Sequence, residues 1–278
     1  LQNPNGWTGE LAQKPYIKHT VFYVGAWPTA GATSVSGLVE SVFGHFEEKA
    51  ITRADGTLMT YYGNWNTSSF TTDALVINHD GQCNSWARFF IDVLRAQGVG
   101  ITYSGNSSSL MKIEPANRLR TRFMMVNNWS FDAANIAVDD PANQQAVQAG
   151  YTNFNRGTIN MQQTSDPNNP NQTIWRYVWL DGANANVRDQ IGIEGQNTPN
   201  PASIFANHEV VQIGNILYDP SYGVTYALGP ANNPLVNFEA AAIAGYARPE
   251  IVNFQNYIVF QRPGVGATST RLVMTKLT

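Results

Sequence analysis

The most informative stretch of this chain begins at residue 81 and contains its only cysteine. It reads Gly81-Gln82-Cys83-Asn84-Ser85-Trp86-Ala87-Arg88-Phe89-Phe90-Ile91-Asp92-Val93-Leu94-Arg95. From Ala87 onward, apolar residues recur at the i, i+3, i+4 and i+7 positions, which is the spacing of one helical face. The pattern predicts an amphipathic helix over about residues 83–97, with the cysteine in its first turn.

The position of Cys83 favours a chemical role for its thiol. The positive end of the helix dipole stabilises a thiolate at this point, and the thiolate is the form that acts as a nucleophile. A cysteine that only packs is more typical of mid-element positions among apolar neighbours. The placement alone leaves both interpretations open, a catalytic nucleophile and a buried structural thiol.

A nucleophilic thiol needs an imidazole to accept and return a proton, and the chain offers four histidines. His19 lies in an alternating run that predicts an outward position on a strand over about 16–25. His45 lies on a predicted helix over about 35–49 and is interpreted as a residue at the boundary between the apolar and polar faces of that helix. His79 precedes the cysteine in a turn-like segment. None of these three is favoured as the base.

The fourth histidine, His208, lies at the start of a predicted hairpin over about residues 207–219. Two β-prone runs flank Gly214-Asn215, a pair that suits a tight turn because both residue types tolerate positive φ. Pairing outward from this turn places Ile213 opposite Ile216, which fixes the register of the two strands.

In that register, His208 and Asp219 lie on the same face as diagonal neighbours, within reach of a side-chain hydrogen bond. A carboxylate in this position would orient the imidazole. The alternative is a surface hairpin that carries the two residues incidentally. The joint occurrence of a histidine, a compatible turn and a carboxylate on one face favours the first interpretation.

Together these motifs resemble the transglutaminase-like superfamily, a branch of the papain-like cysteine enzymes. In that family a Gly-x-Cys motif, here Gly81-Gln82-Cys83, opens a helix that ends in a segment similar to 94–98, and a strand similar to 101–103 follows. The family histidine opens a strand and its aspartate often precedes a proline, as His208 and the Asp219-Pro220 pair do. The resemblance implies Cys83 as nucleophile, His208 as general base and acid, and Asp219 as the orienting carboxylate.

The resemblance also implies an α+β fold with a papain-like or transglutaminase-like core, in which the nucleophile helix packs on an antiparallel sheet. We expect a single domain over residues 1–278. The base follows the nucleophile by 125 positions, which is longer than most family members show, so we expect a large insertion at about 131–203. The residue after the cysteine is commonly aromatic in the family and is Asn84 here.

The sequence offers two candidate donors that would stabilise an oxyanion. The backbone N–H of Cys83 is one candidate, because the first turn of a helix leaves such groups unpaired. Trp65 is a candidate by its proximity in sequence only. Four tryptophans could either line a substrate cleft or belong to the core: Trp65, Trp129, Trp175 and Trp179.

Composition excludes several classes of function. Charged residues make up 13% of the chain, about half the usual share, and the net charge is −3. Without a basic block we expect no nucleic-acid partner, and without a long apolar run we expect no membrane span. One cysteine excludes an intramolecular disulfide, and no His/Cys cluster has metal-ligand spacing, so we expect no metal and no cofactor. The polar, lysine-poor composition favours a bacterial extracellular or cell-envelope protein.

Further elements are predicted from local patterns. They are a Ser34-capped start for the helix over 35–49, a turn at 54–56, and strands near 57–62, 99–104, 121–131, 173–180, 253–261 and 270–276.

The expected reaction is cysteine-dependent acyl transfer on protein or peptide amide groups through a thioester. Resolution of the thioester by an amine gives a transglutaminase, and resolution by water gives an extracellular cysteine peptidase, isopeptidase or deamidase. A non-catalytic binding module that retains the fold is the alternative outside enzymology. The motifs do not decide the oligomeric state.

Overall fold

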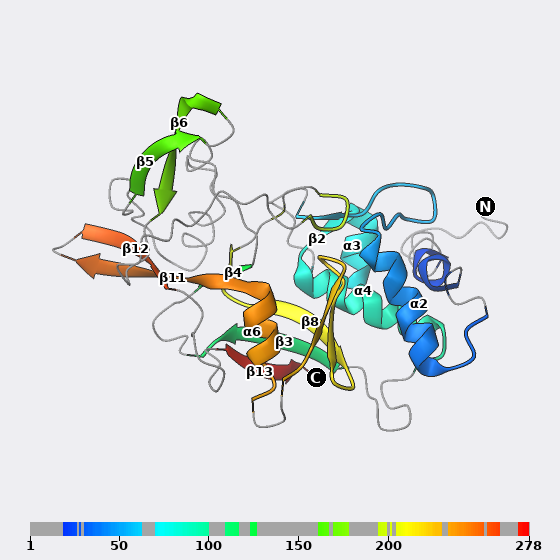
Figure 1. Ribbon diagram of the computed structural model, residues 1–278. Helices are drawn as coiled ribbons and strands as arrows, with labels where there is room; N and C mark the ends of the chain where they lie inside the picture. The colour runs from blue at the N-terminus through cyan, green and yellow to red at the C-terminus, as the bar shows by residue number, and fades with distance from the viewer. Residues whose placement is uncertain are drawn as a thin grey trace.

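The chain has an α+β architecture in the part that the computed structural model describes (Figure 1). The described residues are 19–26, 28, 31–62, 70–99, 109–116, 123–126, 161–166, 169–177, 194–198, 201, 204–229, 233–252, 255–261 and 272–277. The larger sheets are antiparallel, and the helices α2, α3 and α4 gather at one end of the molecule in Figure 1. In these segments no helix combines the length and apolar character that crossing a bilayer requires.

Helix α2 spans Val35–Glu47 and confirms the helix predicted at this place. Ser34 is its N-cap, and the hydroxyl accepts a hydrogen bond from the Gly37 N–H at 3.0 Å. This bond satisfies one of the donors that a helix start leaves unpaired. The buried side chains of α2 recur at helical spacing and are Val39, Val42, Phe43 and Phe46.

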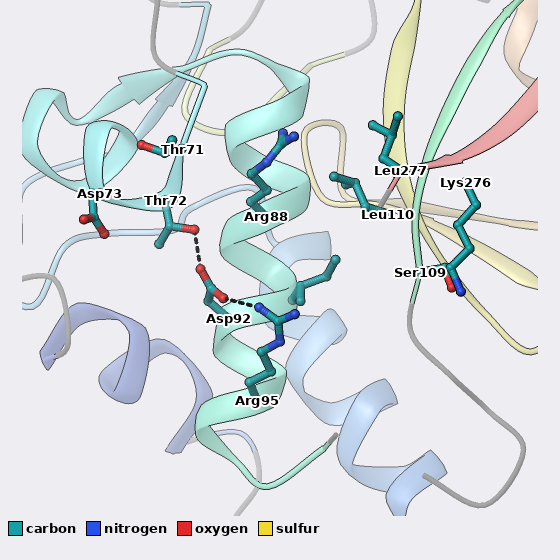
Figure 2. Close-up of a pocket in the computed structure, with 11 residues that line it drawn as sticks. Thr71, Thr72, Asp73, Arg88, Asp92, Arg95, Ser109, Leu110, Lys276 and Leu277 are labelled. Carbon is teal, nitrogen blue, oxygen red and sulfur yellow. Dashed lines mark hydrogen bonds and ion pairs between the residues drawn. The ribbon is translucent and has the colours of Figure 1, made fainter. Parts of the chain in front are cut away.

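Two consecutive helices surround the cysteine motif. Helix α3 (Thr72–Asn78) is capped by Thr71 and ends at His79, whose φ of 46° lies in the left-handed region. Helix α4 (Cys83–Ala96) confirms the prediction over 83–97. The two helices are joined by a hydrogen bond from the Thr72 hydroxyl to Asp92 at 2.6 Å, drawn in Figure 2.

The strand predicted over 16–25 is wrong, because residues 19–26 are helical. The β-branched and aromatic residues of this segment favour a strand locally. Tertiary packing overrides that preference: Val21 and Val24 are buried in the core, and Phe22 between them is exposed. His19 is exposed on this helix rather than on a strand.

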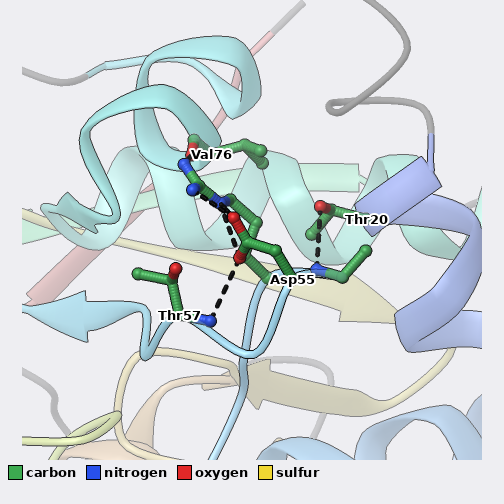
Figure 3. Close-up of polar contacts among 6 residues, drawn as sticks. Thr20, Asp55, Thr57 and Val76 are labelled. Carbon is green, nitrogen blue, oxygen red and sulfur yellow. Dashed lines mark hydrogen bonds and ion pairs between the residues drawn. The ribbon is translucent and has the colours of Figure 1, made fainter. Parts of the chain in front are cut away.

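A turn at residues 54–56 lies between this N-terminal helix and α3, and hydrogen bonds join this segment to both (Figure 3). The backbone N–H of Ala54 donates to the Thr20 hydroxyl at 3.2 Å, and Arg53 donates to the carbonyl of Val76 at 3.4 Å. Arg53 also hydrogen-bonds the carboxylate of Asp55, which holds the pKa of Asp55 well below its ordinary range. The turn was predicted from its sequence, and these contacts fix it between two helices.

The main sheet has five antiparallel strands in the order β10-β9-β8-β3-β13. The predicted hairpin is confirmed, with Ile213 opposite Ile216, and Gly214 alone of the turn pair adopts positive φ, at 59°. The strand predicted over 270–276 is also present. The strands of this sheet are β3 (Ser109–Pro115), β8 (His208–Ile213), β9 (Ile216–Asp219), β10 (Val224–Ala227) and β13 (Leu272–Leu277).

Helix α4 packs on this sheet chiefly through β8. An aromatic cluster joins α2, α4 and β9: the Phe46 ring lies 5.2 Å from that of Phe90, and Phe43 lies 4.9 Å from Tyr218 in an edge-on arrangement. Trp86 is fully buried and its Nε1–H donates to the Thr60 carbonyl at 3.3 Å. Buried aromatic rings of this kind dominate core energetics, so this cluster holds the first turns of α4 in place.

The remaining strands form smaller sheets. The predicted strands near 121–131 and 253–261 correspond to β4 and β12, and that near 173–180 overlaps β6. The prediction over 57–62 is realised as the short β1, whereas that over 99–104 lies almost entirely outside the described residues. These strands are β1 (Thr60–Tyr61), β2 (Asp80–Gly81), β4 (Phe123–Val126), β5 (Met161–Asp166), β6 (Asn169–Tyr177), β7 (Ile204–Phe205), β11 (Ile243–Val252) and β12 (Gln255–Gln261). The helix α6 (Val236–Ala242) directly precedes β11.

The region of the predicted insertion, 131–203, is described only in part. It contains the antiparallel hairpin β5–β6, which Figure 1 shows beyond β11 and β12. The rest of the predicted insertion, apart from residues 194–198 and 201, lies outside the described residues.

Candidate active site

Cys83 is the first residue of α4, and one residue, Gln82, separates it from the short strand β2. The N-cap residue, Gln82, is extended, and its carbonyl accepts the N–H of Trp86 at 3.2 Å. Gly81 fits this turn because it lacks a side chain: a Cβ at that position would lie 2.9 Å from a methyl group of Leu75 and would overlap the Ser85 hydroxyl. The Gly-x-Cys spacing is therefore a packing requirement of the strand-to-helix turn.

His208 and Asp219 occupy the first residue of β8 and the last residue of β9. The Nε2 atom of His208 lies 2.6 Å from Oδ2 of Asp219, so the predicted hydrogen bond is present. A carboxylate only accepts hydrogen bonds, so Nε2 carries the proton. The second oxygen of Asp219 accepts the backbone N–H of Ser221 at 3.1 Å. The carboxylate is thereby held from both sides.

The thiol of Cys83 lies beside the imidazole of His208. Burial on its own lowers the pKa of His208, but the negative charge and hydrogen bond of Asp219, together with the neighbouring thiol, outweigh it and raise the pKa to about 10. The other ring nitrogen, Nδ1, is buried and makes no regular hydrogen bond within the described part of the chain. With Nε2 bound to Asp219, Nδ1 is the ring nitrogen left to interact with the thiol.

The side chains of Cys83, His208 and Asp219 are all buried. Cys83 is 5% exposed, His208 is 3% exposed and Asp219 is 2% exposed. Charges interact more strongly in such a site than in water, because solvent screens them less. A proton moved from sulfur to imidazole here would leave an ion pair supported by Asp219.

Aromatic side chains surround this cluster. The Phe205 ring lies 5.2 Å from the imidazole of His208, and the Tyr222 ring lies 5.8 Å from it. Tyr61 packs edge-on against Tyr222 at 5.1 Å and against Tyr62 at 5.0 Å. Burial raises the pKa of each of these tyrosines, so the phenols stay neutral beside the cluster.

Tyr62 differs from its neighbours in its backbone. Its φ is 52°, a left-handed conformation that is uncommon for a bulky residue, and its N–H donates to the Gly81 carbonyl at 3.1 Å. Such strain persists only where the surrounding structure imposes it, and it is frequent at functional sites. Tyr62 is also only partly buried, whereas Tyr61 and Tyr222 are fully buried.

An ion pair connects the cysteine helix to the histidine strand. Nη1 of Arg88, on α4, lies 2.8 Å from Oε2 of Glu209, the residue after His208, and 3.0 Å from the Asn84 carbonyl. The charged bond therefore spans the interface that brings the thiol and the imidazole together. Sequence reasoning missed this pair and the aromatic surroundings, because their members are brought together only by the tertiary fold.

The other predicted candidates lie elsewhere or outside the described residues. His45 contacts the Val24 carbonyl at 3.3 Å, and His79 is exposed where α3 ends. The alternative oxyanion donor Trp65 lies outside the described residues, as do Trp129 and Trp179, and only the backbone of Trp175 is described, in β6. Among the described residues, no group of three or more His, Cys, Asp or Glu side chains is arranged to hold a metal ion.

Comparison with known proteins gives no match to a family model, to a curated protein or to a solved structure.

Proposed function

We propose that the protein is a transglutaminase-like cysteine acyltransferase that acts on the amide groups of protein or peptide substrates. The observation that carries this proposal is the arrangement of Cys83, His208 and Asp219, three groups from different parts of the chain. The proposal includes a transglutaminase-like core with an insertion at 131–203, in a protein that works outside the bacterial cell or in its envelope.

The first half-reaction forms a thioester. The raised pKa of His208 favours the state in which the thiol proton is already on the imidazole, and the thiolate sulfur of Cys83 attacks the carboxamide carbon. The imidazolium then gives the proton to the departing nitrogen as the carbon–nitrogen bond breaks, and ammonia leaves. Asp219 favours both steps, because its charge stabilises the imidazolium and its hydrogen bond fixes the ring orientation.

The second half-reaction transfers the acyl group to an amine. The amine nitrogen attacks the thioester carbonyl while His208 accepts its proton, and the carbon–sulfur bond breaks. A new amide forms, and the proton stays on His208 beside the released thiolate. The four aromatic rings around the cluster limit the access of water, which supports aminolysis over hydrolysis.

The oxyanion that forms in each half-reaction needs hydrogen-bond donors. The backbone N–H of Cys83 lies in the first turn of α4, where such groups have no acceptor within the helix. The partly exposed, strained Tyr62 has a neutral phenol that interacts electrostatically with Cys83. Donors held in place before reaction are the usual means of stabilising such charge.

The test is incorporation of a labelled primary amine into a glutamine-bearing protein such as casein. We expect covalent label with the natural chain and none with Cys83→Ala or His208→Gln. His19→Gln is the matched control, because His19 is an exposed histidine of the N-terminal helix. Release of ammonia or cleaved peptide without label identifies a hydrolase. No product, together with a thiol that stays unreactive in the native protein, identifies a binding module.

A further inference from the structure

A second site lies along the same helix, away from the cysteine cluster. Helix α4, the start of α3, the beginning of β3 and the end of β13 enclose a pocket of about 480 Å³ (Figure 2). This volume is typical of sites that bind small molecules. Cys83, His208 and Asp219 do not line it.

The pocket has an unusual number of cationic groups for a chain with so few charges. Arg88 and Arg95 project from α4, and Lys276 comes from β13 on the opposite side. Two carboxylates, those of Asp73 and Asp92, also line it. Glu209, outside the lining, pairs with Arg88, and Asp92 pairs with Arg95, so these two cations are partly neutralised.

The carboxylate of Asp92 is already engaged. One oxygen accepts the Thr72 hydroxyl at 2.6 Å and the other accepts Nη1 of Arg95 at 3.1 Å. Arg95 uses only this nitrogen in that pair, and its side chain is 46% exposed. Lys276 is exposed and has no ion-pair partner among the described residues. Both cations can therefore donate to a ligand.

The remaining lining is aliphatic. Ile91 from α4 is buried behind the charged rim, and Leu110 and Leu277 are half-buried on the two strands. Burial of such side chains against an apolar group is favourable, whereas a small inorganic anion would leave them in contact with water. The pocket therefore combines a cationic rim with an aliphatic surface.

We propose that this pocket binds a carboxylate attached to an aliphatic chain, with the carboxylate at Arg95 and Lys276 and the chain against Leu110 and Leu277. A fatty acid and the C-terminus of a peptide with aliphatic last residues share this chemistry. The inference does not depend on the proposed acyl transfer, because the lining residues are distinct from the cysteine cluster.

The probes are octanoate and N-acetyl-leucyl-leucine, each titrated into the full chain and followed by NMR. We expect saturable binding with a dissociation constant on the order of 1 mM or lower for at least one of them. Tighter binding of octanoate indicates a fatty-acid site, and tighter binding of the dipeptide indicates a peptide C-terminus. Octan-1-ol and octylammonium test the charge requirement, and we expect both to bind at least about fivefold more weakly.

Two substitutions test the cationic rim. Lys276→Gln and Arg95→Gln should each weaken binding about fivefold. Lys49→Gln, at a lysine beyond the end of α2 and outside the pocket, is the matched control and should leave the affinity unchanged. Cys83→Ala should also bind normally, so failure of the acyl transfer proposal would not affect this result. Absence of binding, equal affinity for octan-1-ol, equal affinity for inorganic phosphate, or unchanged affinity in both rim variants would overturn the proposal.

Discussion

The cysteine cluster and the pocket beside Arg95 share helix α4 and differ in how water reaches them. In the cluster, Cys83, His208 and Asp219 are buried among aromatic rings, and His208 is hydrogen-bonded to Asp219. In the pocket, cationic side chains extend into solvent around an aliphatic surface. Burial strengthens electrostatic interactions and suits proton transfer, whereas an open charged rim suits the capture of a ligand.

The strongest test of this difference is removal of the base. His208→Gln should lower amine incorporation about 1,000-fold or more, because the thiol loses its proton acceptor and the leaving group loses its donor. The rate of label incorporation per unit of protein measures this effect. Octanoate binding in the pocket should stay unchanged in the same variant. Loss of both functions would show that the two regions are not separate.

Asp219→Asn should have the next largest effect. The amide leaves His208 without its counter-charge and lowers the pKa of the imidazole towards its ordinary value. We expect about a 100-fold loss of activity and a decrease of about 3 kcal/mol in the free energy of unfolding. Kinetic assays and urea denaturation measure the two quantities. Unchanged activity in a folded variant would exclude an orienting role for this carboxylate.

The raised pKa of His208 also predicts a dependence of stability on pH. The folded-state pKa of about 10 lies above the ordinary value of 6.5, so the native state binds this proton more tightly. Its contribution to stability is complete below about pH 6.5 and is lost as the pH rises towards 10. We expect the free energy of unfolding to fall by a few kcal/mol across this window.

Tyrosines and the cysteine also ionise at high pH in the unfolded chain, so the difference between two proteins is the useful quantity. Urea denaturation at several pH values should give a smaller decrease for His208→Gln than for the natural chain. Parallel curves for the two proteins would contradict the raised pKa.

The sequence predicted the local parts of the site and missed the parts that depend on distant contacts. The His208–Asp219 bond follows from a two-residue turn and the period of a strand, both of which are local. Strand β3 was missed, although its side chains alternate between buried and half-buried. It pairs with β8 and β13, which lie far along the chain, and no turn signal marks those pairings.

The Arg88–Glu209 ion pair gives a smaller and more specific prediction about positioning. Arg88→Met should lower kcat about tenfold with little change in KM, because the helix that carries Cys83 loses its charged contact with the strand that carries His208. The double variant Arg88→Met/Glu209→Met should recover much of this loss, since it no longer leaves the largely buried carboxylate of Glu209 without its partner. A merely additive double variant would indicate that the two side chains act independently.

The smallest expected effect comes from the cap of α2. Ser34→Ala removes the bond to the Gly37 N–H and should lower the free energy of unfolding by about 1 kcal/mol. Neither amine incorporation nor octanoate binding should change, because the cap lies in neither region. Thermal denaturation measures the stability, and a change in either function would indicate coupling through α2.

The reactivity of the single thiol tests the central claim most directly. Iodoacetamide labelling of Cys83 at pH 6, followed by mass spectrometry of the intact native protein, reports whether the sulfur is held as a thiolate beside an imidazolium. We predict that the natural chain is alkylated at least about tenfold faster than His208→Gln. Equal rates for the two proteins, or a native thiol that resists labelling in both, would contradict the account.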